Sequence, residues 1–179
     1  MVRVLSAAVL AACLAGALPA LAQTTTPSGA MPGATSGSLT ELDRQFMIQD
    51  ATGGVYEISL ATLARERSSR DDIKAYASML IQDHAEYNGA LQQLARSKGV
   101  TLPTDISPDD RTKLNGINLQ GGSTFDRSFI LEAIRINEED KKSAQDEAAA
   151  TRDPDIKAFV QKYAAMDARH EQGAKALQR

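Results

Sequence analysis

The chain contains only two histidines, His84 and His170, and both fall on the apolar face of a predicted helix. Each takes a place in a series of apolar residues that are spaced by three and four positions, the spacing of one helix face. A buried imidazole is costly unless a partner satisfies its nitrogens. Both histidines are therefore candidates for metal ligands or for hydrogen-bonded core residues.

The predicted helices bring further polar groups to the same height. Glu57 is level with His170, and His84 is level with Asn137; at ~1.5 Å per residue the two levels differ by roughly 6 to 8 Å. One carboxylate, two imidazoles and an amide can then converge in mid-bundle. Imidazole and carboxylate together suit iron, manganese, zinc or copper. We predict a divalent transition metal as the candidate cofactor, with Glu57, His84 and His170 as its ligands.

The competing interpretation is structural. Each histidine is then a core residue bonded to a buried carboxylate or tyrosine, with Asp167 or Tyr163 as the candidate partner of His170. A di-iron oxidase centre fits poorly, because it needs Glu-x-x-His on two helices and only Asp167-Ala168-Arg169-His170 approximates that motif. The sequence has neither a Gly-x-Ser-x-Gly elbow nor a P-loop, and we predict no catalytic residues.

The elements that must position these residues are helices. Tryptophan is absent and aromatic residues make up 4% of the 179 residues, which favours an all-α fold. The first helix is predicted over about residues 40–67, opened by Thr40 with Asp43 as its capping-box partner. Gly53-Gly54 interrupts it, which indicates either a kink or the close packing of a neighbouring backbone. The second helix is predicted to open at Ser69 and to stop at Gly99.

A long link follows, over residues 99–124, with a short helix begun by Ser107-Pro108. The third long helix is predicted from Ser123 or Thr124, and the fourth from Asp153-Pro154, an N-cap followed by proline. Two hairpins joined by a long crossover describe a ferritin-like four-helix bundle. An up-down-up-down bundle with a decorated middle loop remains the alternative.

The charge pattern limits the partners. The formal net charge is -3, and basic residues are spread among acidic ones without a basic run or a stacking platform, so we predict no nucleic-acid partner. Acidic groups such as Glu138-Glu139-Asp140 are interpreted as solvated charges. The polar stretch from Glu138 to Glu147 is a solvated face or, alternatively, a surface for an envelope partner. The oligomeric state is not predicted.

The first residues predict export. Arg3, an apolar run and Ala20-Leu21-Ala22 form a signal peptide over residues 1–22, so that the mature chain begins at Gln23 and has no transmembrane span. A minority alternative is a lipid anchor on Cys13 in a lipobox-like sequence. Residues 23–38, rich in Thr, Ser, Gly and Pro, predict a flexible linker before a domain over residues 39–179. The periplasm is the predicted location.

Several local patterns together resemble a known family. They are Asp43-Arg44-Gln45-Phe46, Gly54 with Glu57, Ile73-Lys74-Ala75-Tyr76-Ala77, Asp83-His84, Phe125-Asp126-Arg127 and the late His170. In this order and spacing they resemble the domain of unknown function 4142 family, exported bacterial proteins often labelled outer membrane proteins. The resemblance implies a ferritin-like bundle in the periplasm or at the envelope, with no established enzymatic activity.

The resemblance also bears on the site. Glu57, Asp83, His84 and His170 match family positions that can line the bundle interior, whereas Asn137 stands where the family usually has a histidine. An amide is a poor transition-metal ligand, which weakens the metal hypothesis for this chain. The sequence therefore predicts an exported ferritin-like bundle that binds a transition metal, in metal handling or envelope stress. The alternative is a non-catalytic structural or interaction protein of the envelope.

Overall fold

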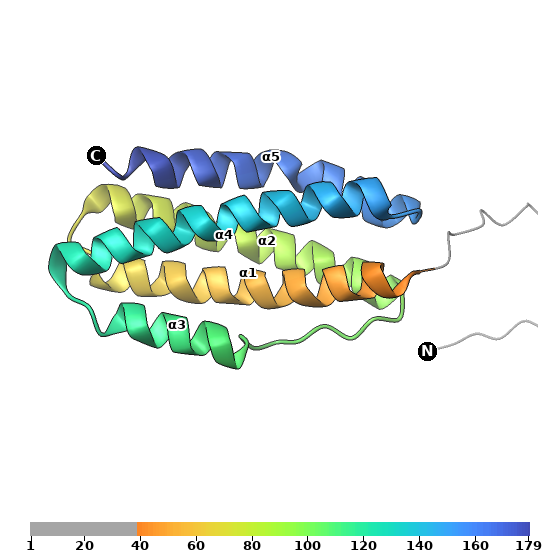
Figure 1. The fold of residues 1–179 in the computed structure, drawn as a ribbon, viewed down its shortest axis with the longest axis horizontal. Helices are drawn as coiled ribbons and strands as arrows, with labels where there is room; N and C mark the ends of the chain where they lie inside the picture. The colour runs from red at the N-terminus through yellow and green to blue at the C-terminus, as the bar shows by residue number, and fades with distance from the viewer. Residues whose placement is uncertain (1–38) are drawn as a thin grey trace, which may run out of the picture. The chain divides into compact units, whose positions relative to one another are not determined.

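The computed structural model describes residues 39–179, which form five helices and no strand within that range (Figure 1). The predicted signal peptide, the lipid-anchor alternative at Cys13 and the predicted linker over residues 23–38 lie outside the described residues. The helices are α1 (Glu41–Arg67), α2 (Asp71–Ser97), α3 (Pro108–Asn118), α4 (Gly122–Ala150) and α5 (Pro154–Ala176). The all-α prediction is confirmed.

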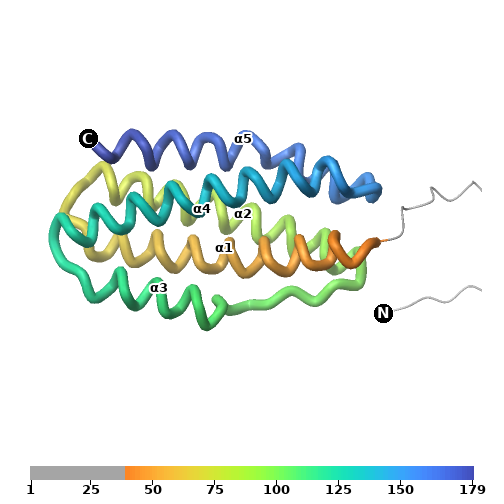
Figure 2. Tube along the Cα trace, viewed as in Figure 1, coloured from red at the N-terminus to blue at the C-terminus, as the bar shows by residue number. Residues whose placement is uncertain are grey.

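Four long helices lie side by side, and the closest contacts are within the hairpins α1–α2 and α4–α5. Helix α1 also contacts α4, and α2 contacts α5. The link after α2 runs back along the bundle before α4 begins, so α2 and α4 point the same way (Figure 2). The short helix α3 lies in this link against α1 and α4.

Most helix starts follow the local signals. Thr40 and Asp43 form the capping box of α1, Ser107 accepts a hydrogen bond from the Asp110 amide at the start of α3, and Asp153 caps α5. These three predictions are confirmed. Helix α2 stops at Ser97, shortly before Gly99, whose φ of 69° suits the residue that follows a helix end.

Two predicted starts were wrong by one or two residues. The N-cap of α2 is Arg70, not Ser69. The Arg70 backbone is extended, its amide donates a hydrogen bond to the Ser68 hydroxyl, and its guanidinium pairs with Asp72 at 2.7 Å. Helix α4 begins at Gly122, before the predicted Ser123 or Thr124.

The apolar core is divided into two clusters. The first includes Leu60, Ile73 and Phe129, and the second, toward the other end of the bundle, includes Met47 and Leu91. On α2, α4 and α5, the polar residues His84, Asp140 and Asp167 lie between the residues of these two clusters, and on α1 Asp50 and Glu57 lie where the clusters meet. Within residues 39–179, no helix combines the length and hydropathy that a membrane crossing requires.

Candidate functional site

A cluster of buried and half-buried polar side chains lies in the middle of the bundle, and all four long helices contribute to it. Helix α1 provides Asp50 and Glu57, α2 provides His84, α4 provides Asp140 and α5 provides Asp167. We call these five residues the central cluster. They line a cavity of about 10 Å³, roughly the space of one water-sized sphere.

His84 is the least satisfied member of the central cluster. It is 4% exposed, and its Nε2 lies 3.1 Å from Glu57 Oε2, but neither ring nitrogen makes a hydrogen bond. Burial lowers the pKa of His84, so the imidazole is neutral at pH 7. A neutral imidazole with a free lone pair is the form that binds metal ions.

Burial raises the pKa of each carboxyl group around His84, and most strongly for Glu57 and Asp140. Burial raises the pKa of Glu57 to about 8, that of Asp50 to about 7 and that of Asp167 to about 6. Burial and the neighbouring Glu57 carboxyl raise the pKa of Asp140 well above its usual value, and these two carboxyls share a hydrogen bond. Protons therefore occupy places that a cation could take.

His170 does not line the cavity, but its ring packs against the ring of His84. The two rings are 5.2 Å apart, and His170 Nε2 lies 2.9 Å from Asp83 Oδ2. Burial lowers the pKa of His170 to about 4, so the neutral ring donates its Nε2 hydrogen to Asp83. Nδ1 then has no hydrogen-bond partner. The partner of His170 is Asp83, and the sequence-based candidates Asp167 and Tyr163 were wrong.

The structure thus brings the three predicted ligands together, with Glu57 beside His84 and His170 behind it. Asn137 takes no part, because its Nδ2 donates to the Ala133 carbonyl at 2.8 Å. The α4 side chain at the cavity is Asp140, three residues later.

The sequence-based interpretation did not identify three carboxyls of the central cluster, Asp50, Asp140 and Asp167, as candidate ligands. Asp140 was grouped with solvated charges, which was wrong, although it stands four residues after the buried Ile136 and so continues an apolar helix face. Glu147, seven residues further on, is also buried, so the polar half of α4 is not wholly a solvated face. Asp50 likewise stands seven residues before Glu57, two turns along the same face of α1.

Gly54 sets the distance between α1 and α2 beside the cavity. A Cβ atom there would lie 2.1 Å from Asn88 Oδ1, so only glycine fits this contact without a shift. Helix α1 continues through Gly53-Gly54, so the glycines do not interrupt it, and Gly54 makes room for the Asn88 side chain rather than for the neighbouring backbone that the sequence predicted. At Gly53 an added Cβ atom would meet nothing within 4 Å.

In residues 39–179, no three His, Cys, Asp or Glu side chains already stand in an arrangement that holds a metal ion. The central cluster gathers the donor types of a metal site, but its carboxyls are bonded to other protein groups. Tyr87 donates to Asp50, and Glu57 shares a proton with Asp140. The arrangement is chemically able to accept a cation in exchange for protons.

A family model described as a domain of unknown function (DUF4142) matches residues 28–177. The chain belongs to the DUF4142 family. The family predicted from the residue patterns is confirmed, and the description of DUF4142 assigns no function. The match begins ahead of the first residue of α1 and covers all five helices of this DUF4142 chain.

Comparison with the curated proteins gives no match for this DUF4142 chain. Among solved structures, it is similar to the crystal structure of a DUF305 fragment from Deinococcus radiodurans, with a TM-score of 0.69 and 14% sequence identity. The likeness covers 78% of this chain and 96% of the other. At this identity it shows a shared fold and nothing of shared chemistry.

Proposed function

We propose that this DUF4142 protein is an exported envelope protein that binds a divalent transition metal in the central cluster. The observation that carries the proposal is His84, buried, neutral and without a hydrogen bond, beside carboxyls from the other three long helices. In this assignment His84 and Glu57 are ligands, and Asp140 and Asp167 complete the set. His170 supports the site from behind, through its contact with the His84 ring.

The energetics favour a ligand over a purely structural role. A buried polar group without a hydrogen bond costs ~1–3 kcal/mol, and several carboxyls are held near it. A divalent cation would satisfy the imidazole lone pair and allow the carboxyls to ionise, which turns a destabilising cluster into a binding site. Because the donors are nitrogen and oxygen, the candidate ions are iron, manganese, zinc and copper.

Two further features support the biological setting. The long link that returns along the bundle between α2 and α4 supports the proposal of a ferritin-like four-helix layout, a layout that builds metal sites from inward side chains. The leader-like sequence of residues 1–22 supports export to the periplasm, where metal handling or envelope stress would be the role.

A second candidate function is a non-catalytic structural or interaction protein of the envelope. Its support is that several polar groups of the cluster have protein partners: His170 bonds to Asp83, and Tyr87 bonds to Asp50. In that case the cluster specifies how the helices pack and binds no ion.

The test is metal binding by the mature protein, purified without a His-tag, beside the variants His84→Gln and Glu138→Gln. Glu138 is an exposed carboxylate on α4 that does not line the cavity. We expect near-stoichiometric binding of one of the four ions to the wild type and to Glu138→Gln, and none to a folded His84→Gln. Absence of binding to the wild type for all four ions would contradict the proposal and favour the structural candidate.

A further inference from the structure

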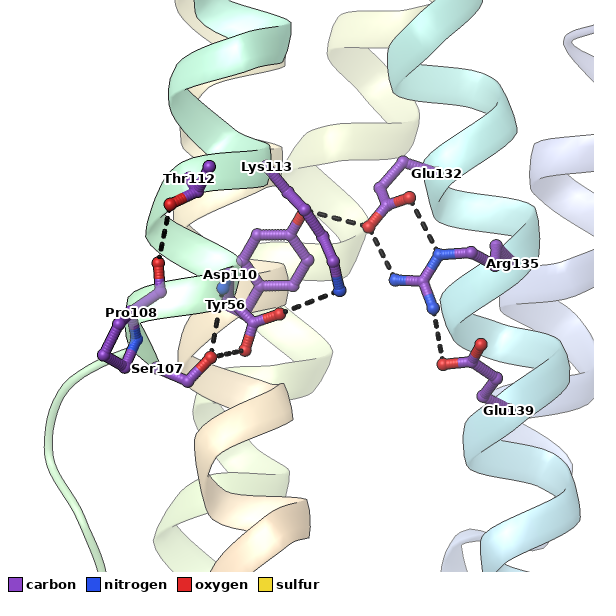
Figure 3. Close-up of polar contacts among 9 residues, drawn as sticks. All are labelled: Tyr56, Ser107, Pro108, Asp110, Thr112, Lys113, Glu132, Arg135 and Glu139. Carbon is purple, nitrogen blue, oxygen red and sulfur yellow. Dashed lines mark hydrogen bonds and ion pairs between the residues drawn. The ribbon is translucent and has the colours of Figure 1, made fainter.

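A groove on the surface adjoins the central cluster at one residue, Asp140. It has a volume of about 390 Å³ and lies between α1, α4 and the start of α3. Gly53 and Tyr56 come from α1, Asp110 and Lys113 from α3, and Glu139 from α4. Figure 3 shows side chains of α3 and α4 facing each other across Tyr56. We call this feature the α3 groove.

Asp140 belongs both to the α3 groove and to the central cavity. Asp140 therefore lies between the α3 groove and the central cavity. The residue is only half-buried. A group that is reached from the groove and also lines the cavity is suited to take a cation from the surface side and pass it inward.

The charges of the α3 groove favour cations. Lys113 Nζ is held by Asp110 at 3.2 Å, and Arg135 is held by Glu132 at 2.6 Å and by Glu139 at 2.5 Å (Figure 3). The Tyr56 hydroxyl donates to the same Glu132 at 2.9 Å. Both cations are therefore paired. When Glu132 at the edge of the groove is counted, three carboxylates, Asp110, Glu132 and Glu139, face two cations, so the groove has a small negative charge that attracts a positive ion even with Asp140 protonated.

Gly53 has no other structural explanation. A glycine inside a helix costs ~1 kcal/mol relative to alanine. Gly54 is explained by Asn88, but a Cβ atom at Gly53 would meet nothing within 4 Å. Because Gly53 lines the α3 groove, a larger side chain there would project into open space in the groove.

We propose that the α3 groove is the access route of the metal ion to the central cluster, with Asp140 as its first ligand and Gly53 keeping the groove open. This inference rests on the proposed metal-binding function. The ligand is a divalent transition-metal ion that arrives hydrated and loses water as it passes Asp140.

The test compares Gly53→Phe with Gly89→Phe in stopped-flow loading of Zn²⁺ and Mn²⁺. Gly89 is the matched control: it lies inside α2, an added Cβ atom there also meets nothing within 4 Å, and it lines a different surface pocket. We expect Gly53→Phe to slow loading by about tenfold or more, as blocking a gate does. Its equilibrium affinity and helix content should match the wild type. Gly89→Phe should load at the wild-type rate.

The outcomes separate the two proposals. If the wild type binds metal and Gly53→Phe loads as fast as Gly89→Phe, the access route is wrong and the metal site stands. If both variants slow loading equally, the effect is not specific to the groove and the route is again wrong. If the wild type binds neither ion, nor iron or copper, the proposed function fails and the route fails with it.

Discussion

Two buried carboxyl pairs lie between α1 and α4, and they differ in what surrounds them. At the start of α1, Asp43 and Glu147 share a hydrogen bond; in the central cluster, Glu57 and Asp140 do. Asp43 also accepts from the Thr40 amide at 2.6 Å and from its hydroxyl at 2.7 Å. We call Asp43 and Glu147 the end pair, and Glu57 and Asp140 the central pair.

The pKa values show the consequence. Burial opposes the charge of Asp43, but hydrogen bonds from Thr40 and Thr151 outweigh burial and lower its pKa. In the end pair, hydrogen-bond donors thus stabilise the charge of Asp43, while burial raises the pKa of its partner Glu147 to about 7. In the central pair burial prevails and raises the pKa of both members. A carboxyl pair suggests a ligand site only where donors stabilise the charge of neither member.

The largest expected effect is a difference in metal affinity between a variant of the central pair and a variant of the end pair. Asp140→Asn should weaken metal affinity by at least about 10- to 100-fold, which is the cost of losing a hydrogen-bonding partner of a metal ligand. Glu147→Gln should leave the affinity unchanged, because the end pair is not part of the cavity. Competition titration measures both. Equal losses in the two variants would show that the pairs do not differ in function.

The second prediction concerns pH and the metal-free protein. Glu57 and Glu147 have folded-state pKa values of about 8 and about 7, above the ordinary 4.5, so the folded state holds protons that the unfolded state releases. Their contribution to stability is complete below pH 4.5 and is lost as the pH rises through 7 and 8.

Histidines act in the opposite direction, but in a lower window. Burial lowers the pKa of His170 from 6.5 to about 4, so its contribution is lost as the pH falls below 6.5 toward 4. Between pH 6.5 and 8.5 only the carboxyls change their contribution to stability. The free energy of unfolding, measured by urea titration, should therefore fall as the pH rises over this range. Glu147→Gln should make that fall smaller. A stability that rises over this range would contradict the raised pKa values.

The third prediction tests the cap of the end pair. Thr40→Ala removes the hydroxyl that both accepts from the Asp43 amide and donates to its carboxylate. Loss of such a cap costs about 1 kcal/mol of unfolding free energy. Chemical denaturation at pH 7 measures it, and metal affinity should not change. A loss of metal binding would mean that the end pair and the central cluster are coupled.

The smallest expected effect is a gain in stability rather than a loss. His84→Leu replaces an imidazole that makes no hydrogen bond with an apolar side chain of similar size, so the metal-free protein should be unchanged or up to about 1 kcal/mol more stable. Denaturation in the presence of a chelator measures this. A marked loss of stability would assign His84 a structural role and would favour the second candidate function.

Contacts between residues close in sequence decide the parts of the fold that could be predicted. Thr40 with Asp43 and Asp153 before Pro154 act within one helical turn, so the sequence alone locates those helix starts. Asp140 was misjudged because its role depends on how α4 is rotated about its axis. Tertiary contacts fix that rotation. Asn137 and Asp140 are three residues apart and lie on nearly the same helix face, so the rotation decides which of them lines the cavity.

The partner of His170 shows the same limit. Asp83 lies on α2, and its meeting with His170 depends on the contact between two hairpins that are separated by the long link. Glu57 and His84 were found because each continues an apolar helix face at mid-height, a property that the sequence carries. Asp167 was considered as a hydrogen-bond partner and in an approximate Glu-x-x-His motif, but not as a separate ligand, although it stands four residues after the buried Tyr163 and three before His170.

The hairpin arrangement has a consequence for folding kinetics. The closest contacts lie within α1–α2 and within α4–α5, whose connections are short, so each hairpin can close rapidly before the two dock. The central cluster is assembled only at docking, because its members come from both hairpins. An ion bound there would join the two halves, and it should slow unfolding far more than it speeds refolding.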